Sequence, residues 1–246
     1  CILVITEGNS GAGYANAMVK LIPNGTDFIG VLPMRGKALN VRDCPRTQLE
    51  LNVEFNELKK ALGLREGTIY DAETARKDLR YGQVLIAADS DVDGKHIIGL
   101  IANYFDVRFR SLLLGGFVRY LRTPILRARK GKECHCFLTA GQYEEWVKVT
   151  PDHQKWSTFY YKGLGTSKDQ DVEEDLKDPF HVVMVYDEGA EKNLQLAFDK
   201  DFRDARKKWI FDHSDVVVPL ERIEPITQFI NADLIEYSIA NVQRSI

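Results

Sequence analysis

The sequence predicts an α/β fold in which a mainly parallel sheet is flanked by helices. A pattern of strand, polar turn and helix occurs three times in the first half of the chain, which is typical of parallel sheets. The strand candidates are short runs of branched apolar residues, as expected for strands buried on both faces. The second half changes character and predicts a smaller α+β extension.

The first repeat opens the chain. ILVIT (2–6) predicts a buried strand, and the glycine-rich polar turn EGNSGAG follows it. YANAMVKLI (14–22) predicts a helix, because Pro23 and Gly25 come directly after it as stop signals. DFIGVLP (27–33) then predicts the second strand.

The next two repeats follow a basic loop, MRGKALNVRD. Residues 47–62 predict a helix with Gly63 as its stop, because their apolar residues recur at helical spacing. VLIAA (84–88) predicts a third buried strand. Residues 96–109 predict an apolar helix that packs on the sheet.

The second half predicts shorter elements. Residues 117–139 alternate in polarity and bend at Pro124, which indicates a strand pair around a turn near Gly131. The remaining predicted elements are a short helix (140–148), a strand that runs into a glycine-rich turn (157–165), a strand (181–187), a helix (189–211) and a last amphipathic helix (226–239).

The bulk composition is that of a soluble globular protein, with 44% hydrophobic and 28% charged residues in 246. The net charge of −3 gives no overall basic bias toward nucleic acid, although a local basic patch can still bind it. The four cysteines include no CxxC pair, so we expect free thiols in a reducing compartment. No signal peptide and no apolar run long enough for a membrane span is present, so we expect an intracellular protein. The abrupt start and end indicate a fragment of a longer chain.

Three aspartates stand at alternate positions directly after the third predicted strand. Asp89, Asp91 and Asp93 lie in LIAADSDVDGKHI, and like charges this close repel unless they are solvated, protonated or bound to a cation. A calcium loop of the EF-hand type would need Glu where Leu100 stands. A helix cap would need only one acid.

A magnesium site explains the alternation best. Mg²⁺ binds carboxylates, keeps several waters and is completed by substrate phosphates. Glu7 follows the first strand as Asp89 follows the third, and the carboxyl ends of parallel strands meet at one edge of a sheet. We therefore expect Glu7 and Asp89 to meet, although they are far apart in the sequence.

These residues carry a family resemblance. Glu7-Gly8 after one strand, with Asp89-x-Asp91-x-Asp93-Gly94 after a later one, resembles the Toprim fold of topoisomerases, bacterial-type primases and related nucleases. Three further segments resemble type IIA topoisomerases: LPMRGKALNV (32–41), TFYYKGLGTS (158–167) and LIEYSIANVQRSI (234–246). TPDHQKW (150–156) resembles the eukaryotic topoisomerase II branch, cellular or viral.

The resemblance implies an ATP-dependent enzyme that cuts one DNA duplex, passes another through and reseals the first. It implies a Toprim metal-binding core with a Rossmann-like sheet (1–125), a C-terminal Toprim extension with the YYKGLGTS segment (126–225), and a helix leading into a winged-helix DNA gate (226–246). The attacking tyrosine would lie beyond Ile246 and the ATPase domain before Cys1. The fragment is therefore expected to bind metal and DNA without cleaving alone.

The resemblance also implies roles for the acidic residues. Glu7 is a metal ligand and the general acid/base at the leaving 3′ oxygen. Asp89 and Asp91 are metal ligands, and Asp93 is a ligand of a second, more weakly held ion. The implied cofactor is Mg²⁺, which Mn²⁺ can replace, while ATP is used by the absent N-terminal domain.

The implied DNA-binding residues are Arg35 and Lys37, a basic pair in a glycine turn, and Lys162 with Gly163, where a strand meets the glycines. The implied partners are double-stranded DNA and a second copy of the full-length protein, with no membrane. The implied location is the nucleus if the source is a cellular eukaryote, although the fragment carries no targeting signal. A further basic cluster over 119–130 is interpreted equally as a phosphate track or as a solvated face.

Two departures from the family pattern stand beside the acids. Asn9 replaces a usual Asp, and Lys95 stands where a small hydroxyl residue is common. His96 is expected to pack rather than to catalyse. Two alternatives stay open: another Toprim enzyme, such as a primase or nuclease, and a metal-dependent DNA-binding module without catalysis of its own.

Overall fold

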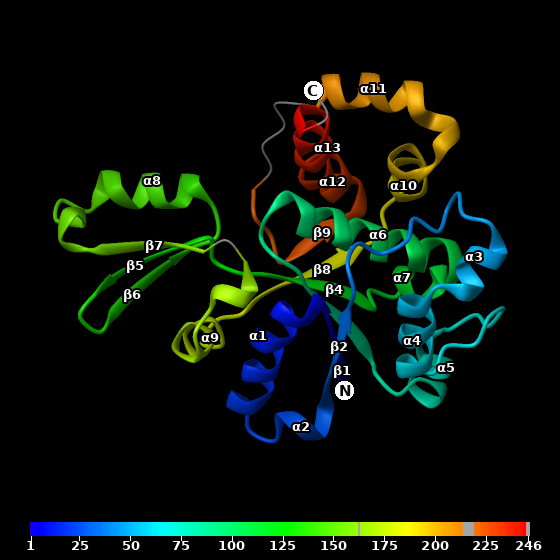
Figure 1. The fold of residues 1–246 in the computed structure, drawn as a ribbon, viewed down its shortest axis with the longest axis horizontal. Helices are drawn as coiled ribbons and strands as arrows, with labels where there is room; N and C mark the ends of the chain where they lie inside the picture. Colours follow the sequence, from blue (N-terminus) through cyan, green and yellow to red (C-terminus); the bar gives the residue numbers. More distant parts are fainter. Residues whose placement is uncertain (162, 214–218, 245–246) are drawn as a thin grey trace.

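A six-stranded sheet with the order β2-β1-β3-β4-β8-β9 forms the centre of the structure (Figure 1). The structure is a computed structural model, and it describes residues 1–161, 163–213 and 219–244. The strands are β1 (Ile2–Glu7), β2 (Ile29–Met34), β3 (Gln83–Ala87), β4 (Val118–Arg122), β8 (Phe180–Val185) and β9 (Ile223–Pro225). The first four are mutually parallel, β8 is antiparallel to β4, and β9 is parallel to β8. The predicted α/β fold with a mainly parallel sheet is confirmed.

Helices cover both faces of this sheet, because alternate residues of the apolar strands point to opposite sides. On one face, Leu3, Ile5 and Ile86 belong to the larger core. The helices that complete this core are α4 (Val53–Leu62), α6 (Val92–Arg108), α7 (Arg110–Leu114), α10 (Ala190–Phe198), α12 (Ile226–Asn231) and α13 (Asp233–Arg244). On the other face, Val4 and Leu85 pack against α1 (Gly8–Leu21) and α9 (Asp169–Asp175).

A second, three-stranded sheet stands beside the first (Figure 1). Its order is β6-β5-β7, with β5 (Leu126–Lys130), β6 (Glu133–Phe137) and β7 (Ser157–Tyr160). Gly131 makes the predicted turn between β5 and β6 with a φ of 60°, a left-handed conformation that glycine adopts without strain. Helix α8 (Ala140–Val149) contributes Tyr143 and Trp146 to a small apolar cluster with Phe137.

Two predicted helices are broken by local side-chain bonds. The helix expected over 47–62 is α3 (Arg46–Leu51) followed by α4, because the Asn52 side chain accepts a bond from the Phe55 backbone N–H and caps α4. The helix expected over 189–211 is interrupted at Asp199, whose side chain accepts from the Asp201 N–H. It resumes as α11 (Arg203–Asp212).

The other differences concern boundaries and short elements. The helix expected over 226–239 is α12 and α13, separated at Ala232. Helix α1 begins at Gly8, directly after β1, and α6 begins at Val92, within the acidic motif. The segment 117–139 holds three strands instead of two, since β4 joins the central sheet. Four short helices were not predicted: α2 (Gly25–Phe28), α5 (Ala72–Asp78), α7 and α9. No helix in the described part of the chain is both long and apolar enough to cross a membrane.

Candidate metal and nucleic-acid site

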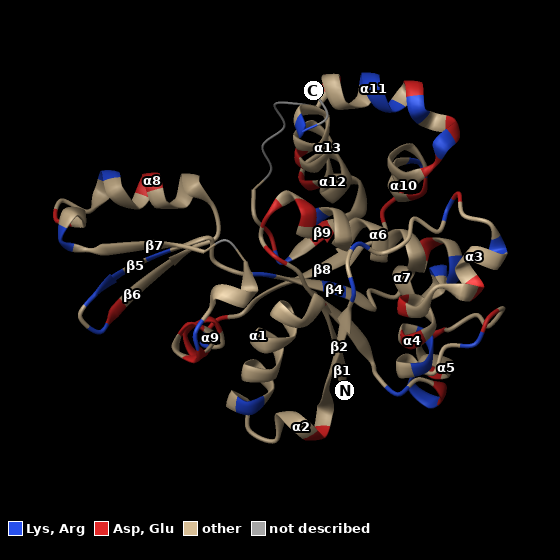
Figure 2. Ribbon diagram, in the orientation of Figure 1, with Lys and Arg blue, Asp and Glu red and all other residues tan. Residues whose placement is uncertain are grey.

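The central sheet brings Glu7 and Asp89 to one edge. Glu7 ends β1, and Asp89 follows β3 by two residues. The two strands are parallel neighbours, with Thr6 opposite Ala87, so their carboxyl ends lie side by side. The carboxylates interact electrostatically, as the strand-end argument predicts. Acidic residues gather in the loop before α6 (Figure 2).

Glu7 is held in its charged form only at a cost. Burial raises the pKa of its carboxyl above 4.5, and the negative charges of Asp89 and Asp91 raise it further. A bond from the Asp89 backbone N–H offsets part of this. The Oε2 atom is buried and has no hydrogen-bond partner among the described residues. Burying a charged carboxylate oxygen is costly unless it is paired or binds a metal ion.

Asp89 is fixed in place by the segment that follows β7. Its Oδ1 accepts a bond of 2.7 Å from the Leu164 backbone N–H. Burial raises the pKa of Asp89, the bond from Leu164 lowers it, and the charge of Asp91 raises it, with a net rise. A Cβ on Gly163 would lie 2.3 Å from Asp89 Oδ2, so only glycine lets the two segments approach this closely. Lys162, the neighbouring predicted DNA contact, lies outside the described residues.

Asp91 connects the motif to helix α6. It is the N-cap of that helix, and its Oδ1 accepts a bond of 2.9 Å from the Gly94 N–H. A Cβ on Gly94 would lie 2.0 Å from the backbone oxygen of Asp89, which explains the glycine in the motif. Asp91 is exposed, so its carboxylate remains open to solvent beside Glu7.

Asp93 differs from the other acids because basic side chains already pair with it. Lys37 Nζ lies 2.8 Å from Oδ1 and Arg244 Nη1 lies 3.0 Å from Oδ2. The bond from Lys37, aided by Arg244, holds the pKa of Asp93 below its usual range. The predicted Lys37 is therefore placed beside the acidic motif, and the predicted Arg35 is exposed in the same loop after β2.

The geometry of the acids fits an open cation site. Within the described part of the chain, no three His, Cys, Asp or Glu side chains form a group that could hold a metal ion alone. Mg²⁺ is commonly held by one or two carboxylates, with waters and substrate phosphates filling the other positions. Glu7, with its unpartnered oxygen, and the partly exposed Asp89 suit that mode. The assignment of Glu7, Asp89, Asp91 and Asp93 as ligands stays a prediction.

Lys95 and His96 both make structural contacts. Lys95 Nζ pairs with Asp233 at 2.9 Å and Glu236 at 2.5 Å, so its charge is directed to α13. His96 stacks on Tyr237 with ring centroids 3.9 Å apart, and burial lowers its pKa to about 4. The packing role expected for His96 agrees with this contact. Asn9 is exposed.

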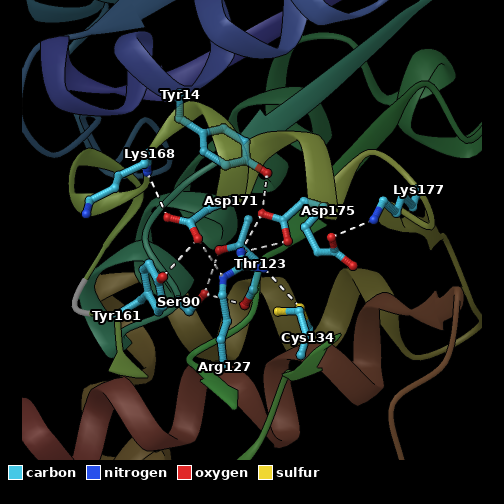
Figure 3. Close-up of polar contacts among 12 residues, drawn as sticks. Tyr14, Ser90, Thr123, Arg127, Cys134, Tyr161, Lys168, Asp171, Asp175 and Lys177 are labelled. Atoms are coloured by element: carbon cyan, nitrogen blue, oxygen red, sulfur yellow. Dashed lines mark hydrogen bonds and ion pairs between the residues drawn. The ribbon is translucent and has the colours of Figure 1, made fainter. Parts of the chain in front are cut away.

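Much of the basic cluster over 119–130 is neither a free phosphate track nor a solvated face. Arg127, whose side chain is 1% exposed, donates to both Asp175 oxygens at 2.7 and 2.8 Å. Asp175 also accepts from Tyr14 on α1 at 3.0 Å. Arg129 donates to Asp171 at 2.7 Å. We call Tyr14, Arg127, Arg129, Asp171 and Asp175 the junction network; Figure 3 labels all of them except Arg129.

The junction network connects the small sheet to helix α9, which packs on the central sheet, since Arg127 and Arg129 belong to β5 while the two aspartates belong to α9. A similar pairing holds Arg122 of β4 to Asp233 of α13 at 2.6 Å. These partners are far apart in the sequence, so no local pattern could have identified them. The only available signal was the alternation of arginines along β5.

Two family models match the chain. The Toprim domain matches residues 2–124, and the C-terminal associated domain of TOPRIM matches residues 121–242. Among curated proteins, the chain is 35% identical to human DNA topoisomerase 2-alpha and 39% identical to the mitochondrial DNA topoisomerase 2 of Dictyostelium discoideum. Both alignments cover 100% of this chain, but they cover only 17% and 20% of those two proteins.

A solved structure agrees with these matches. The DNA-binding, cleavage and re-ligation domain of Plasmodium falciparum topoisomerase II superposes with a TM-score of 0.89 at 32% identity. That similarity covers 99% of this chain and 34% of the other. The resemblance seen in the sequence motifs therefore extends to the whole described fold.

Proposed function

The chain belongs to the Toprim family and corresponds to the Toprim region of the eukaryotic type II DNA topoisomerases; on this premise we propose that it binds Mg²⁺ and double-stranded DNA. In this role it supports cleavage and religation by a tyrosine on a neighbouring domain. The full-length protein would be an ATP-dependent, homodimeric DNA topoisomerase that carries out double-strand passage. The chain itself spans about a fifth of the curated relatives it matches.

One observation carries the proposal: two acids at adjacent strand ends lack cationic partners among the described residues. Glu7 and Asp89 both have raised pKa values, because both are partly buried and lie near other negative charges. An arrangement that raises the free energy of the charged state is expected where an external cation binds. A divalent ion there would stabilise negative charge on a phosphate oxygen.

Each residue of the proposed site has a separate role. Glu7 would exchange a proton with the leaving 3′ oxygen, because its raised pKa makes it a stronger proton acceptor than an ordinary carboxylate. Asp89, held by the Leu164 N–H, and Asp91, held by the Gly94 N–H, would bind the ion from fixed positions. Arg35 and Lys37 would contact the DNA backbone beside the acids.

The proposed roles follow from charge as well as position. Lys37 lies 2.8 Å from Asp93, so a phosphate that approaches the acids meets a basic side chain at their rim. Asp93 is already neutralised by two basic residues, which suits it to orient Lys37 and Arg244 or to hold a second ion weakly. The nuclear location proposed for a cellular eukaryotic source follows from the relatives alone.

A DNA-binding measurement tests the proposal. Fluorescence anisotropy of a nicked duplex, with and without Mg²⁺, should show tighter binding with the ion for the wild-type chain. The double variant Asp89→Ala, Asp91→Ala should lose the Mg²⁺-dependent part and retain the Mg²⁺-independent part. DNA binding that ignores both Mg²⁺ and the double substitution would contradict the proposal.

A cleavage assay separates the alternatives. The isolated chain should leave supercoiled DNA intact in Mg²⁺, because the attacking tyrosine is expected on another domain. Nicking by the chain alone, lost in the same double variant, would instead favour a Toprim nuclease.

A further inference from the structure

A basic cavity lies at the edge of the central sheet opposite the acidic edge. Its lining includes Cys1, directly before β1, and Gly82, directly before β3. It therefore lies at the amino ends of the two strands whose carboxyl ends lead to Glu7 and Asp89. In Figure 1 the N-terminus and α5 lie together at this end of the sheet. The cavity has a volume of about 620 Å³, which is within the usual range of small-molecule sites.

Three arginines line this cavity without carboxylate partners. Arg76 belongs to α5, Arg80 follows that helix, and Arg119 belongs to β4. Among the residues that the structure describes, none of the three forms an ion pair with an acidic side chain. Arg80 donates a bond of 2.7 Å to the backbone oxygen of Lys60, which carries no charge. The cavity wall therefore carries three positive charges that no paired side chain neutralises.

Arg119 shows this lack of a partner most clearly. Its side chain is partly buried, and its Nε is fully buried with no hydrogen-bond partner in the described part of the chain. A buried donor left unpaired costs free energy. The charge of Arg119 also acts beyond the cavity, because it adds to the effect of burial in lowering the pKa of His181. A bound anion would supply both a hydrogen-bond acceptor and a counter-charge.

The acidic residue of the lining does not neutralise the arginines. Asp71 lies at the start of α5, and its Oδ1 accepts a bond of 2.8 Å from the Thr74 backbone N–H as the N-cap of that helix. It makes no ion pair with a described residue. Three arginines against one aspartate leave the side chains of the lining with a net charge of +2. The cavity as a whole therefore favours an anion.

The neutral part of the lining suits a phosphate group with an organic part attached. Ser111 Oγ accepts a bond of 2.9 Å from the Tyr70 N–H, so its own O–H remains able to donate. The rings of Tyr70, Tyr81 and Phe117 also line the cavity. Guanidinium groups bind phosphate oxygens in pairs, and aromatic rings cover the apolar part of a small ligand. A DNA duplex, in contrast, is too wide to enter a cavity of this volume.

We propose that this cavity binds a small, multiply charged phosphate compound through Arg76, Arg80 and Arg119. The phosphate oxygens accept bonds from the guanidinium groups and from the Ser111 hydroxyl, and an attached organic group lies against Tyr81. No covalent bond forms or breaks. The proposed Mg²⁺ and DNA site lies at the other end of the strands, so either proposal can fail alone.

Isothermal titration with inorganic pyrophosphate, without divalent ions, tests the site. The wild-type chain should bind one equivalent saturably. Arg76→Gln and Arg119→Gln should each weaken binding at least about tenfold, because each removes a charge-assisted hydrogen bond. Circular dichroism checks that both variants fold, and Arg76 is exposed, so its replacement leaves the core intact. Arg203→Gln, which removes an exposed arginine of α11 outside the cavity, is the matched control and should bind as the wild type does.

Two competitors define the ligand. A nucleoside diphosphate that binds more tightly than pyrophosphate would support the site and show that it takes nucleotides, whereas equal affinity would support recognition of the phosphate groups alone. A nicked duplex should not displace pyrophosphate, and the Asp89→Ala, Asp91→Ala variant should bind pyrophosphate normally. The proposal would be overturned by the absence of saturable binding, by equal affinity in Arg119→Gln and Arg203→Gln, or by displacement with the duplex.

Discussion

The acidic edge and the junction network place carboxylates in similar surroundings but treat their charge in opposite ways. At the edge, Glu7 and Asp89 are partly buried without ion-pair partners in the described part of the chain. In the network, Asp175 receives two bonds from Arg127, and Asp171 receives one from Arg129. The same chemical group therefore has an internal counter-charge in one region and lacks it in the other.

The pKa directions alone do not separate the two regions. Burial raises the pKa of Asp171, but bonds from the Lys168 N–H, Tyr161 and the neighbouring arginines outweigh it, so the net pKa is lowered. The pKa of Asp175 is raised because its burial outweighs Arg127. Burial alone thus does not distinguish the regions. The regions differ in whether a basic side chain neutralises the carboxylates. A carboxylate without such a partner indicates a binding site for an external cation, whereas a carboxylate paired with arginine indicates a contact that stabilises the fold.

The largest expected effect comes from removing the counter-charge of the junction network. Arg127→Leu should lower the free energy of unfolding by about 3–5 kcal/mol, because it leaves Asp175 buried and unpaired. Urea unfolding followed by circular dichroism measures the change. Arg46→Ala, which breaks the exposed pair with Glu50, is the control and should cost less than about 0.5 kcal/mol. Equal losses of unfolding free energy in the two variants would mean that the Arg127–Asp175 pair does not stabilise the fold more than an exposed ion pair does.

The next effect concerns the glycine that lets Asp89 meet the segment after β7. Gly163→Ala should displace the Asp89 carboxylate, since the new Cβ would lie 2.3 Å from Oδ2, and should weaken divalent-ion binding about tenfold, or about 1.4 kcal/mol. Isothermal titration with Mn²⁺ measures this. Gly141→Ala is the matched control, because its Cβ would meet nothing closer than 3.9 Å. Unchanged affinity in Gly163→Ala would mean that Asp89 does not bind the ion.

A smaller effect follows from removing the uncompensated charges. Glu7→Gln with Asp89→Asn should raise the stability of the metal-free chain at pH 7 by on the order of 0.5 kcal/mol, because both side chains remain partly solvated and screened. The folded-state pKa values are raised, so the wild type binds these protons more tightly when folded. The stabilisation that Glu7 and Asp89 give the wild-type fold is therefore present at low pH, and it is lost as the pH rises above 3.8–4.5.

The advantage of this double variant should therefore grow between about pH 4 and pH 7. Asp171 and Asp233 have lowered pKa values, so they stabilise the fold when they are charged. That stabilisation is lost as the pH falls below 3.8. Thermal unfolding across this pH range measures both. A double variant that loses stability at pH 7 would show that the acids support the fold and would contradict the comparison.

The smallest effect tests the rim of the acidic edge. Arg35 is exposed and makes no hydrogen bond or ion pair among the residues that the structure describes. Arg35→Ala should weaken binding to a nicked duplex and reduce the slope of log affinity against log salt by about 1. Lys20→Ala, an exposed substitution at the far end of α1, should leave the slope unchanged. The same slope for both variants would place the DNA elsewhere.

The sequence predicted the acidic edge because its signals are local. Branched apolar runs identify β1 and β3, and Glu7 and Asp89 follow directly from their ends. The shared edge then follows from parallel pairing. The glycines at 94 and 163 were visible as motif letters, but their reason, close approach to Asp89, needed coordinates.

The junction network could not be predicted, because its partners are separated by tens of residues and are chosen by tertiary packing. Arg127 meets Asp175, and Lys95 meets Asp233, only after the sheets and α13 are assembled. The helix breaks at Asn52 and Asp199 had local causes, since both residues are good caps. Hydrophobic periodicity simply continued through both positions and concealed them.

The central claim, that the missing counter-charge marks a cation site, is tested most directly by Mn²⁺ binding. Electron paramagnetic resonance of free Mn²⁺ measures binding to the wild-type chain and to the Glu7→Gln, Asp89→Asn variant, each with a nicked duplex present. The account predicts saturable binding to the wild type and at least a tenfold loss in the variant. Equal binding in both would contradict it and would mean that the acidic edge is not where the ion is held.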